Sequence, residues 1–405
     1  MSNLNFLHSG GNKVTLSTPD NNPSSDITFK LPQADGSAGE VLRSDASGAL
    51  SFGSEISPNM VNNGGMTISQ RYGTSENTPS NNGHTLDQMR YDLSQTGKFK
   101  VQQVTDSPAG FSHSMKVTSL SAYTSSVNDY FLLQTFIEGT DSARLGWGTS
   151  DAQTVTLSFY VKSSITGVHA CGIRNQNYSR GNTQTYTINN ANTWERKTVT
   201  FTGDTSGTWL TTTNSGLKIN FDLGSGSNFQ AASTGTWLAT NDFITSNSVK
   251  IVGTNAATWY ITGIQLQVGD MPTPFQHRSF TEELTRCYRY YRRFGANGAL
   301  PTPAVYNRLS IGYAPSSSVV RYLFQLDPPM RINPVNSNFS HSGNFNIQPG
   351  SLGSGSFSCE DLASSANSML VKLENTSVTA GTGAAVSLHQ NNDATAYMDI
   401  SAEMT

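Results

Sequence analysis

The sequence predicts an all-β protein in which antiparallel sheets pack into sandwiches. Short runs alternate between apolar and polar residues, as in Thr154–Lys162, where Val155, Leu157 and Phe159 fall on one face of the expected strand. Turn-forming residues separate these runs and no helical period lies between them, which favours antiparallel sheets. Charged residues make up 13% of the 405-residue chain, which suits sheets with many exposed turns, and 10% aromatic residues argue against disorder.

The composition also limits the function. A formal net charge of −3 gives no electrostatic reason to expect a nucleic-acid partner. Cys171, Cys287 and Cys359 show neither metal-ligand spacing nor an even-numbered disulfide framework, so we expect free, buried thiols. No metal or cofactor is expected. The N-terminus lacks a signal-peptide pattern and no apolar run reaches transmembrane length, so we expect synthesis in a host cytoplasm without a signal peptide, and no membrane insertion.

The sequence of residues 1–63 predicts a short N-terminal segment made of β-hairpins. Val14–Leu16 and Ile27–Leu31 are strand-like, and Asp-Gly and Ser-Gly pairs follow as hairpin turns. Such a segment cannot bury a core from one chain. The run LPQADGSAGEVLRSDASGALSF, Leu31–Phe52, resembles a segment near the start of bacteriophage fibre proteins, in which three chains commonly wrap such hairpins into a prism. The resemblance implies trimerisation and attachment to the virion, and the alternative is an unstructured tail.

Residues 64–278 predict one large β-sandwich. Turn signals separate strand-like runs at Lys98–Val104, Ser114–Thr118, Tyr130–Ile137, Thr154–Lys162, Tyr186–Ile188, Glu195–Thr202, Leu217–Leu223, Val249–Val252 and Trp259–Val268. Four motifs resemble, in the same order, the jelly-roll of carbohydrate-binding modules: Gly110–Thr118, Thr156–Lys162, Trp194–Phe201 and Trp259–Leu266. This resemblance implies the fold more than the ligand.

A strand, a proline-punctuated corner and a linking helix are predicted next. Trp259–Val268 alternates as a half-buried strand, and the two prolines that follow prevent its ladder from continuing. Ser279 stands three residues before Glu282, the spacing of a capping box, and the helix is expected over residues 279–294. Its apolar face and its arginines are expected to form a domain or oligomer contact through Leu284, Tyr288, Tyr291, Arg289 and Arg292.

The same stretch resembles a segment of many bacteriophage tail-fibre and receptor-binding proteins. In that family a jelly-roll ends in G-[VI]-Q-L-E-V-G, followed by T-P-F-E-x-R and a helix of the type E-L-x-x-C-x-R-Y-Y. This chain reads ITGIQLQVGDMPTPFQHRSFTEELTRCYRYYRR, with Gln267 where the family usually has glutamate. The arginines and tyrosines that alternate in this helix could also bind the phosphate backbone of a nucleic acid. A contact between subunits fits the net negative charge of the chain better than nucleic-acid binding does. There the arginines would pair with Glu282 and Glu283 of neighbouring chains.

Residues 295–405 predict a second, smaller β-sandwich that is a candidate receptor-binding tip. Arg321–Leu326, Met369–Leu373 and Tyr397–Met404 are strand-like. The runs LDPPMRINP and YMDISAEM resemble the C-terminal ends of phage fibre chains. We therefore expect this domain to pack around a threefold axis.

Aromatic residues in connecting loops are the candidate sugar-binding residues. Sugars pack their C–H faces on aromatic rings and pair their hydroxyls with polar side chains, so glycan sites combine both types. Trp209 and Trp237 lie in loops rich in Gly, Thr and Asn, and Tyr178 and Arg180 occupy a similar loop. The competing interpretation is that the tryptophans plug the ends of the sandwich.

No catalytic constellation is predicted. Asp129, Glu138, Asp141 and Asp151 crowd one region, and paired carboxylates can hydrolyse glycosides, but their spacing matches no hydrolase signature. Turn-forming aspartates at strand ends are the simpler interpretation. We therefore expect a protein that is not an enzyme.

Together these features predict a homotrimeric bacteriophage tail fibre or receptor-binding protein located in the virion. It would attach to other virion tail proteins through its N-terminus and bind host-surface glycan, with several weak sites on one particle acting together. The first alternative is a fibre that depolymerises polysaccharide. The second is a purely structural collar or capsid-decoration protein.

Overall fold

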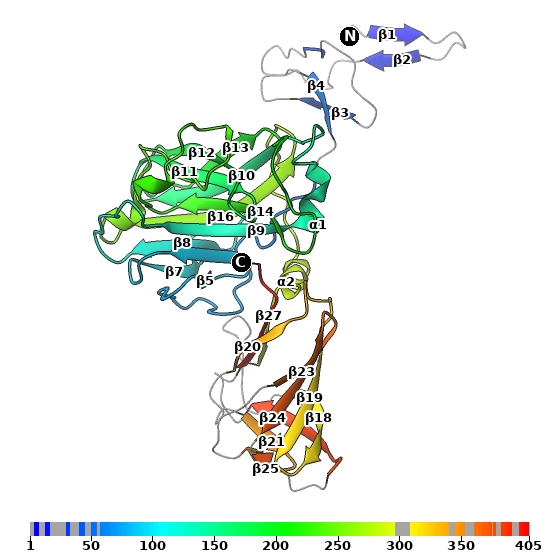
Figure 1. Cartoon of the computed structure of the whole chain (residues 1–405). Helices are drawn as coiled ribbons and strands as arrows, with labels where there is room; N and C mark the ends of the chain where they lie inside the picture. Colours follow the sequence, from blue (N-terminus) through cyan, green and yellow to red (C-terminus); the bar gives the residue numbers. More distant parts are fainter. Residues whose placement is uncertain are drawn as a thin grey trace. The chain divides into compact units, whose positions relative to one another are not determined.

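The computed structural model describes residues 4–7, 13–16, 30–32, 40–44, 50–54, 57–295, 308–339, 345–352, 360–374, 376–377, 382–390 and 397–404. The chain forms two compact units, Met1–Ser57 and Pro58–Thr405 (Figure 1). Strands dominate both units, so the predicted all-β class is confirmed. The finer domain boundaries expected at residues 63 and 278 stay predictions.

The first unit contains two antiparallel hairpins. β1 (Leu4–Leu7) pairs with β2 (Lys13–Leu16), and β3 (Glu40–Ser44) pairs with β4 (Leu50–Ser54). Of the strand expected at Ile27–Leu31 only the last two residues are described, and the Lys30 carbonyl accepts a hydrogen bond from the Leu50 amide at 2.8 Å. The expected turn residues lie outside the described part of the chain.

The large sandwich is built from two antiparallel sheets. The five-stranded sheet has the order β13-β10-β16-β8-β7 and the seven-stranded sheet has the order β15-β12-β11-β14-β9-β6-β5. The first sheet contains β7 (Phe99–Val104), β8 (Ser114–Ser119), β10 (Val155–Ser163), β13 (Glu195–Phe201) and β16 (Thr258–Val268). The second contains β5 (Gly83–His84), β6 (Met89–Leu93), β9 (Phe131–Glu138), β11 (Gly167–Arg174), β12 (Gly181–Ile188), β14 (Ser215–Asp222) and β15 (Trp237–Leu238).

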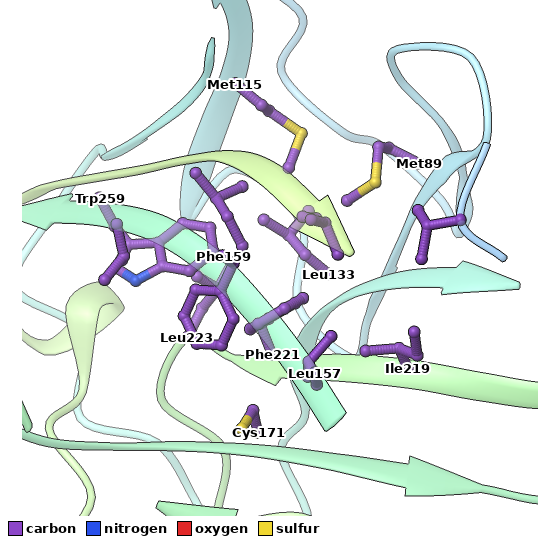
Figure 2. Close-up of a cluster of buried hydrophobic side chains, with 14 of the residues drawn as sticks. Met89, Met115, Leu133, Leu157, Phe159, Cys171, Ile219, Phe221, Leu223 and Trp259 are labelled. Atoms are coloured by element: carbon purple, nitrogen blue, oxygen red, sulfur yellow. The ribbon is translucent and has the colours of Figure 1, made fainter. Parts of the chain in front are cut away.

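Aromatic side chains from both sheets meet in one core, which Figure 2 shows in close-up. The rings of Phe159 in β10 and Phe221 in β14 lie 5.1 Å apart between centroids. Trp259 of β16 lies 5.8 Å from Phe221 and is fully buried. These cross-sheet contacts make the two layers a sandwich, and the alternation of core residues along each strand follows from the period of two.

The predicted strand at Val249–Val252 is wrong. This segment leads into a 3₁₀ turn, η3 (Ile251–Gly253), whose Ile251 and Val252 still bury their side chains in the core. Burial of apolar residues alone does not specify a strand. Two further 3₁₀ turns are η1 (Ala143–Leu145), which follows the short helix α1 (Gly139–Ser142), and η2 (Ser227–Phe229).

The linking helix is shorter than expected. α2 spans Phe280–Tyr288, and the Ser279 hydroxyl accepts a hydrogen bond from the Glu282 amide at 3.2 Å, so the predicted N-cap is confirmed. The expected continuation to residue 294 is wrong, because Tyr291–Gly295 forms β17 and pairs with β27 (Tyr397–Ser401). A run of tyrosines and arginines ending in phenylalanine also suits a strand, and its ladder partner lies near the other end of the domain.

The C-terminal strands form a second, smaller pair of sheets. Phe294 of β17 lies 5.0 Å from Phe324 of β19 between ring centroids, so the two sheets share a core. The sheets have the orders β17-β27-β20 and β21-β26-β18-β19-β24-β23, with β22 paired to β25. The additional strands are β18 (Arg308–Ser316), β19 (Val319–Gln325), β20 (Val335–Phe339), β21 (Phe345–Gln348), β22 (Ser351–Leu352), β23 (Glu360–Ser365), β24 (Ser368–Glu374), β25 (Thr376–Ser377) and β26 (Ala385–Gln390).

One ion pair links the sandwich to the segment that follows α2, and a second lies within the C-terminal sheet. Glu138, at the end of β9, is 1% exposed and accepts hydrogen bonds from Arg289 Nε at 2.8 Å and Arg289 Nη2 at 2.7 Å. The Tyr290 hydroxyl donates to the same carboxylate at 3.0 Å. Arg293 binds Asp399 of β27 through two hydrogen bonds of 2.7 and 2.8 Å. The bidentate geometry gives these pairs directional as well as electrostatic stabilisation.

The residues of α2 and β17 that were expected to form a domain or oligomer contact lie at the joint between the sandwich and the C-terminal sheets. Tyr291 is buried, with the Arg71 guanidinium 3.5 Å from its ring centroid, and Arg292 lies 4.9 Å from the Tyr288 ring centroid. Leu284 is half-buried on α2. Glu282 and Glu283 pair within the same chain, with Arg286 at 3.4 Å and with Arg278 at 3.5 Å respectively. A contact of this surface with another subunit stays a prediction.

Candidate functional site

A pocket of about 290 Å³ opens on the outer face of the seven-stranded sheet. We call it the sheet pocket. Its volume lies at the lower end of the range typical of small-molecule sites. It is lined by Asn82, Arg90, Asp92, Tyr130, Leu132, Arg174, Tyr178, Phe229, Asn241 and Phe243.

The polar floor of the sheet pocket follows from strand alternation. Leu133 of β9 and Ile219 of β14 belong to the core (Figure 2), so the residues beside them in sequence face away from it. Residues directly opposite in an antiparallel ladder share a face, and the register therefore gathers outward side chains of four neighbouring strands. These outward residues are Arg90, Asp92, Gln134, Arg174, Lys218 and Asn220.

The turn between β11 and β12 places Tyr178 at the sheet pocket. Tyr178 has a φ of 60°, in the left-handed region that residues other than glycine seldom adopt. The Asn175 side-chain oxygen holds the turn, because it accepts hydrogen bonds from the amides of Ser179 at 2.9 Å and Arg180 at 3.1 Å. Lys218 Nζ donates to the Tyr178 hydroxyl at 2.8 Å, which fixes the ring over the sheet.

Arg174 lies at the centre of the polar network. It is 2% exposed, and its Nη1 and Nη2 donate to the side-chain oxygens of Asn241 and Gln134. Its guanidinium also lies 4.9 Å from the Tyr178 ring centroid and 4.7 Å from that of Phe243. Its Nε has no hydrogen-bond partner among the described residues. Arg174 is therefore held in place by neutral groups, with one donor left over.

Aromatic rings form the apolar wall of the pocket. Phe229 stacks on Phe243 with centroids 4.7 Å apart, and Tyr130 meets Phe229 edge-on at 6.0 Å. These rings lie beside the amide of Asn241. The arrangement can hold a ligand that has an apolar face and several hydrogen-bonding groups.

Burial disfavours charge on the cations of this sheet face. It lowers the pKa of Arg174 to about 10. It also lowers the pKa of Lys218 to about 8, and the nearby charges of Arg174 and Arg90 act in the same direction, while Asp92 opposes them. Both shifts mean that the folded protein keeps these side chains charged at a free-energy cost.

We expect Lys218→Met to raise the free energy of unfolding at pH 7 by about 2 kcal/mol, after allowing for the lost hydrogen bond to Tyr178. The folded-state pKa of about 8 lies below the ordinary 10.5, so wild-type stability rises between pH 8 and 10.5 as the buried lysine loses its proton. The advantage of the variant should therefore shrink over that range. Urea unfolding of both proteins at pH 7 to 10 measures this, and a gap that does not change with pH would contradict it.

The structure separates the four residues expected to bind sugar. Tyr178 lies at the sheet pocket, whereas Trp209, Trp237 and Arg180 lie at another part of the sandwich. Trp147, Trp209 and Trp237 form an edge-to-face cluster with centroid separations of 4.7, 5.0 and 5.3 Å, packed against the core. Arg180 forms a bidentate ion pair with the buried Asp204. Its expected contact with ligand stays a prediction.

The tryptophan cluster has its polar atoms occupied. The Trp237 indole N–H donates to the Thr202 carbonyl at 2.8 Å, and the Trp209 N–H donates to Asp204 Oδ2 and the Ser206 carbonyl, both at 3.2 Å. Both rings are half-buried. This geometry favours the competing interpretation, in which the tryptophans close one part of the sandwich.

Most residues of the sheet pocket carry no signal in the sequence. Arg90, Asp92 and Arg174 sit inside strands, where a charged residue usually marks a solvated face, and Phe229 and Phe243 lie in irregular connections. The only usable signal is a charged residue at an outward position of a strand whose other positions are buried. It becomes visible only once the strand order is known.

Two of the four carboxylates considered for hydrolysis, Asp129 and Glu138, have structural partners. Asp129 accepts hydrogen bonds from the Tyr123 hydroxyl at 2.8 Å, Ser94 Oγ at 2.9 Å and the Ser126 amide at 2.7 Å. Glu138 is held by Arg289 and Tyr290 at the joint. Asp151 lies in an exposed turn. Asp141 is near Glu138, and burial together with that carboxylate raises the pKa of Asp141.

In the ranges that the structure describes, no group of three His, Cys, Asp or Glu side chains is placed to hold a metal ion. Cys171 and Cys287 are buried free thiols, and Cys359 lies outside the described residues. None of the helices in the described ranges has the length and apolar character needed to cross a bilayer.

Comparisons with sequences assign no family to the chain. No family model matches it, and no curated protein matches it. The segments that resemble phage fibre proteins therefore stay a resemblance.

Comparisons with solved structures give partial likenesses. One is the enzymatically active domain of tailspike protein 4 of bacteriophage CBA120, with a TM-score of 0.28 and 14% identity, covering 52% of this chain and 21% of that chain. Another is TmCBM61 in complex with β-1,4-galactotriose, with a TM-score of 0.26 and 12% identity, covering 52% and 98%. A third is the family 11 carbohydrate-binding module from Clostridium thermocellum in complex with a β-1,3-1,4-mixed-linked tetrasaccharide, with a TM-score of 0.26 and 11% identity, covering 49% and 98%. Likenesses of this degree carry no argument about the ligand.

Proposed function

We propose that this chain is an adhesion protein that binds host-surface glycan in the sheet pocket, without catalysis. The observation that carries the proposal is the combination of aromatic rings and polar side chains around one cavity of about 290 Å³. Tyr130, Tyr178 and Phe229 supply ring surfaces, and Asn82 and Asn241 supply amides.

A sugar fits this chemistry for a physical reason. One face of a pyranose ring presents C–H groups that pack on an aromatic ring, while its edge presents hydroxyls that donate and accept hydrogen bonds. Carboxamides can both donate and accept, so they pair with hydroxyls in either direction. A shallow site of this size binds weakly by itself, and durable attachment would come from several copies acting on one surface.

A bacteriophage tail fibre, homotrimeric and attached to other virion tail proteins through its N-terminus, is the form of adhesion protein we propose. Two observations support it. The runs at Leu31–Phe52 and across β16 and α2 resemble fibre proteins in sequence. In the β3–β4 hairpin, Leu42 and Phe52 face each other across the ladder and are 53% and 41% exposed, which leaves apolar surface for neighbouring copies to cover.

The double variant Leu42→Asp/Phe52→Asp is expected to dissociate the trimer, because six carboxylates would be placed where three hairpins bury apolar surface. Sedimentation velocity at micromolar concentration should then give the mass of one chain. Val127→Asp is the matched control, since Val127 is also 53% exposed but lies in the sandwich, and it should remain trimeric. A wild-type monomer, or an intact trimer of the double variant, would refute this assembly.

The rival functions make different predictions. A polysaccharide depolymerase needs two facing acids, and the nearby carboxylates Glu138 and Asp129 have structural partners instead. A collar or capsid-decoration protein would bind only virion proteins. Reducing-end release from a bound polysaccharide would indicate the depolymerase, and failure to bind any glycan would favour the structural role.

The experiment is binding of the full-length oligomer to a glycan array and to intact bacteria. We expect retention on a subset of glycans, competition by the free oligosaccharide, and no release of reducing ends. A folded trimer that binds neither glycans nor cells would refute the adhesion proposal.

A further inference from the structure

We propose that the sheet pocket selects a sugar that carries a carboxylate, such as a uronic or sialic acid, with Arg174 as the residue that binds this carboxylate. The inference rests on the proposed glycan binding and specifies the class of glycan. It comes from the balance of charges around the pocket, which differs from what a neutral sugar requires.

Cations outnumber carboxylates in the lining of the sheet pocket. Arg90 and Arg174 line it, and Asp92 is the one acidic side chain among the described residues that do. Asp92 is already engaged, because it accepts from Arg90 Nε at 2.7 Å and from the Gln134 amide. The pocket therefore carries more positive than negative charge before a ligand binds.

Arg174 lacks a carboxylate partner of its own. Its two terminal nitrogens donate to the neutral oxygens of Asn241 and Gln134, and its Nε makes no hydrogen bond among the described residues. A buried guanidinium is usually paired with an anion, since neutral oxygens repay only part of its desolvation. Arg174 lines the pocket although it is almost fully buried, so it borders the cavity that an anion would enter.

The neighbouring groups point in the same direction. Burial lowers the pKa of Arg174, and burial together with the charges of Arg174 and Arg90 lowers the pKa of Lys218, while Asp92 opposes both shifts. A ligand carboxylate would supply a counter-charge, and a guanidinium binds a carboxylate with directional hydrogen bonds. The same ligand needs an apolar face to pack against the aromatic wall of the pocket, which free inorganic anions lack.

A neutral sugar would fit the pocket less well. It could hydrogen-bond to Asn82 and Asn241, but it would displace water from Arg174 without providing a charge. An acidic sugar should therefore bind at least about tenfold more tightly than its neutral counterpart, since one charge-assisted hydrogen bond in a desolvated site exceeds the free energy of a tenfold affinity change.

The test is titration calorimetry of the full chain with uronic- and sialic-acid oligosaccharides, each matched with its carboxyl-reduced form. We expect the acid form to bind at least tenfold more tightly, and Arg174→Met to abolish that preference. Arg196→Met is the control, because Arg196 is an exposed arginine on the other sheet and should leave the preference intact. Should Arg174→Met fail to fold, Lys218→Met serves as the second variant and should reduce the preference.

The outcomes separate the inference from the proposed function. If acid and reduced forms bind equally and both lose affinity in Arg174→Met, the glycan site stands and the carboxylate assignment is overturned. Sulfated or phosphorylated sugars that bind more tightly than every carboxylated one would overturn the assignment as well. If the folded oligomer binds no sugar of any class, both the proposed function and this inference are lost.

Discussion

Tyr178→Asn is expected to weaken glycan binding by about 30-fold, which corresponds to about 2 kcal/mol for removal of a central aromatic side chain. Asparagine is the chosen replacement because it tolerates the left-handed conformation that Tyr178 adopts, with its φ of 60°. The turn should therefore keep its shape while the ring is lost. The measurement is calorimetric titration of the full chain with the tightest oligosaccharide from the array.

Two further variants decide where the sugar binds. Tyr313→Asn removes an exposed tyrosine of the C-terminal domain and should change affinity by less than about twofold. Trp237→Ala removes a ring of the tryptophan cluster and should also leave affinity within about twofold, provided that circular dichroism shows a folded protein. If Trp237→Ala abolishes binding and Tyr178→Asn does not, the tryptophan cluster is the sugar site and the sheet pocket is not.

Arg289→Ala is expected to destabilise the joint between the sandwich and the C-terminal sheets by about 3 kcal/mol. The substitution leaves the Glu138 carboxylate, which is 1% exposed, with the Tyr290 hydroxyl as its only remaining side-chain partner among those described. Removing one partner of a buried ion pair costs more than the pair contributes, because the remaining charge stays desolvated. Calorimetry should show the affected transition lowered by on the order of 5–10 °C.

Arg286→Ala is the matched control in the same helix. Arg286 pairs with Glu282 one turn away, and both side chains are about half exposed, so the loss should be no more than about 0.5 kcal/mol. Equal effects of the two substitutions would show that the Glu138 contact does not hold the joint.

The sequence predicted the layers of this fold better than its connections. Clean alternation, as in Thr154–Lys162, locates a strand because half of its side chains must enter the core. Strand β11, Gly167–Arg174, was missed because His169 and Arg174 interrupt the apolar pattern. Both of these polar side chains are buried, which the pattern alone could not indicate.

The end of α2 shows why element boundaries depend on distant residues. Ser279 and Glu282 mark the start of the helix through local hydrogen bonding, and the start was predicted correctly. The end depends on Tyr291–Gly295 pairing with Tyr397–Ser401, a ladder that no local pattern encodes.

The candidate site was predicted only at Tyr178. A loop tyrosine beside polar residues is a local signal, and Tyr178 lies at the sheet pocket, where its contact with a ligand stays a prediction. The rest of the pocket is assembled by register, which places Arg174 opposite Lys218 and Gln134 opposite Arg90. Strand order is a property of the whole sheet, so these neighbours could not be derived from spacing.

The most direct test of the account is a crystal structure of the full chain with its tightest-binding oligosaccharide. The account predicts sugar density in the sheet pocket, with one ring face on Tyr178 and an acidic group within hydrogen-bonding distance of Arg174. Density against the tryptophan cluster or on the C-terminal sheets, with no sugar in the sheet pocket, would contradict it.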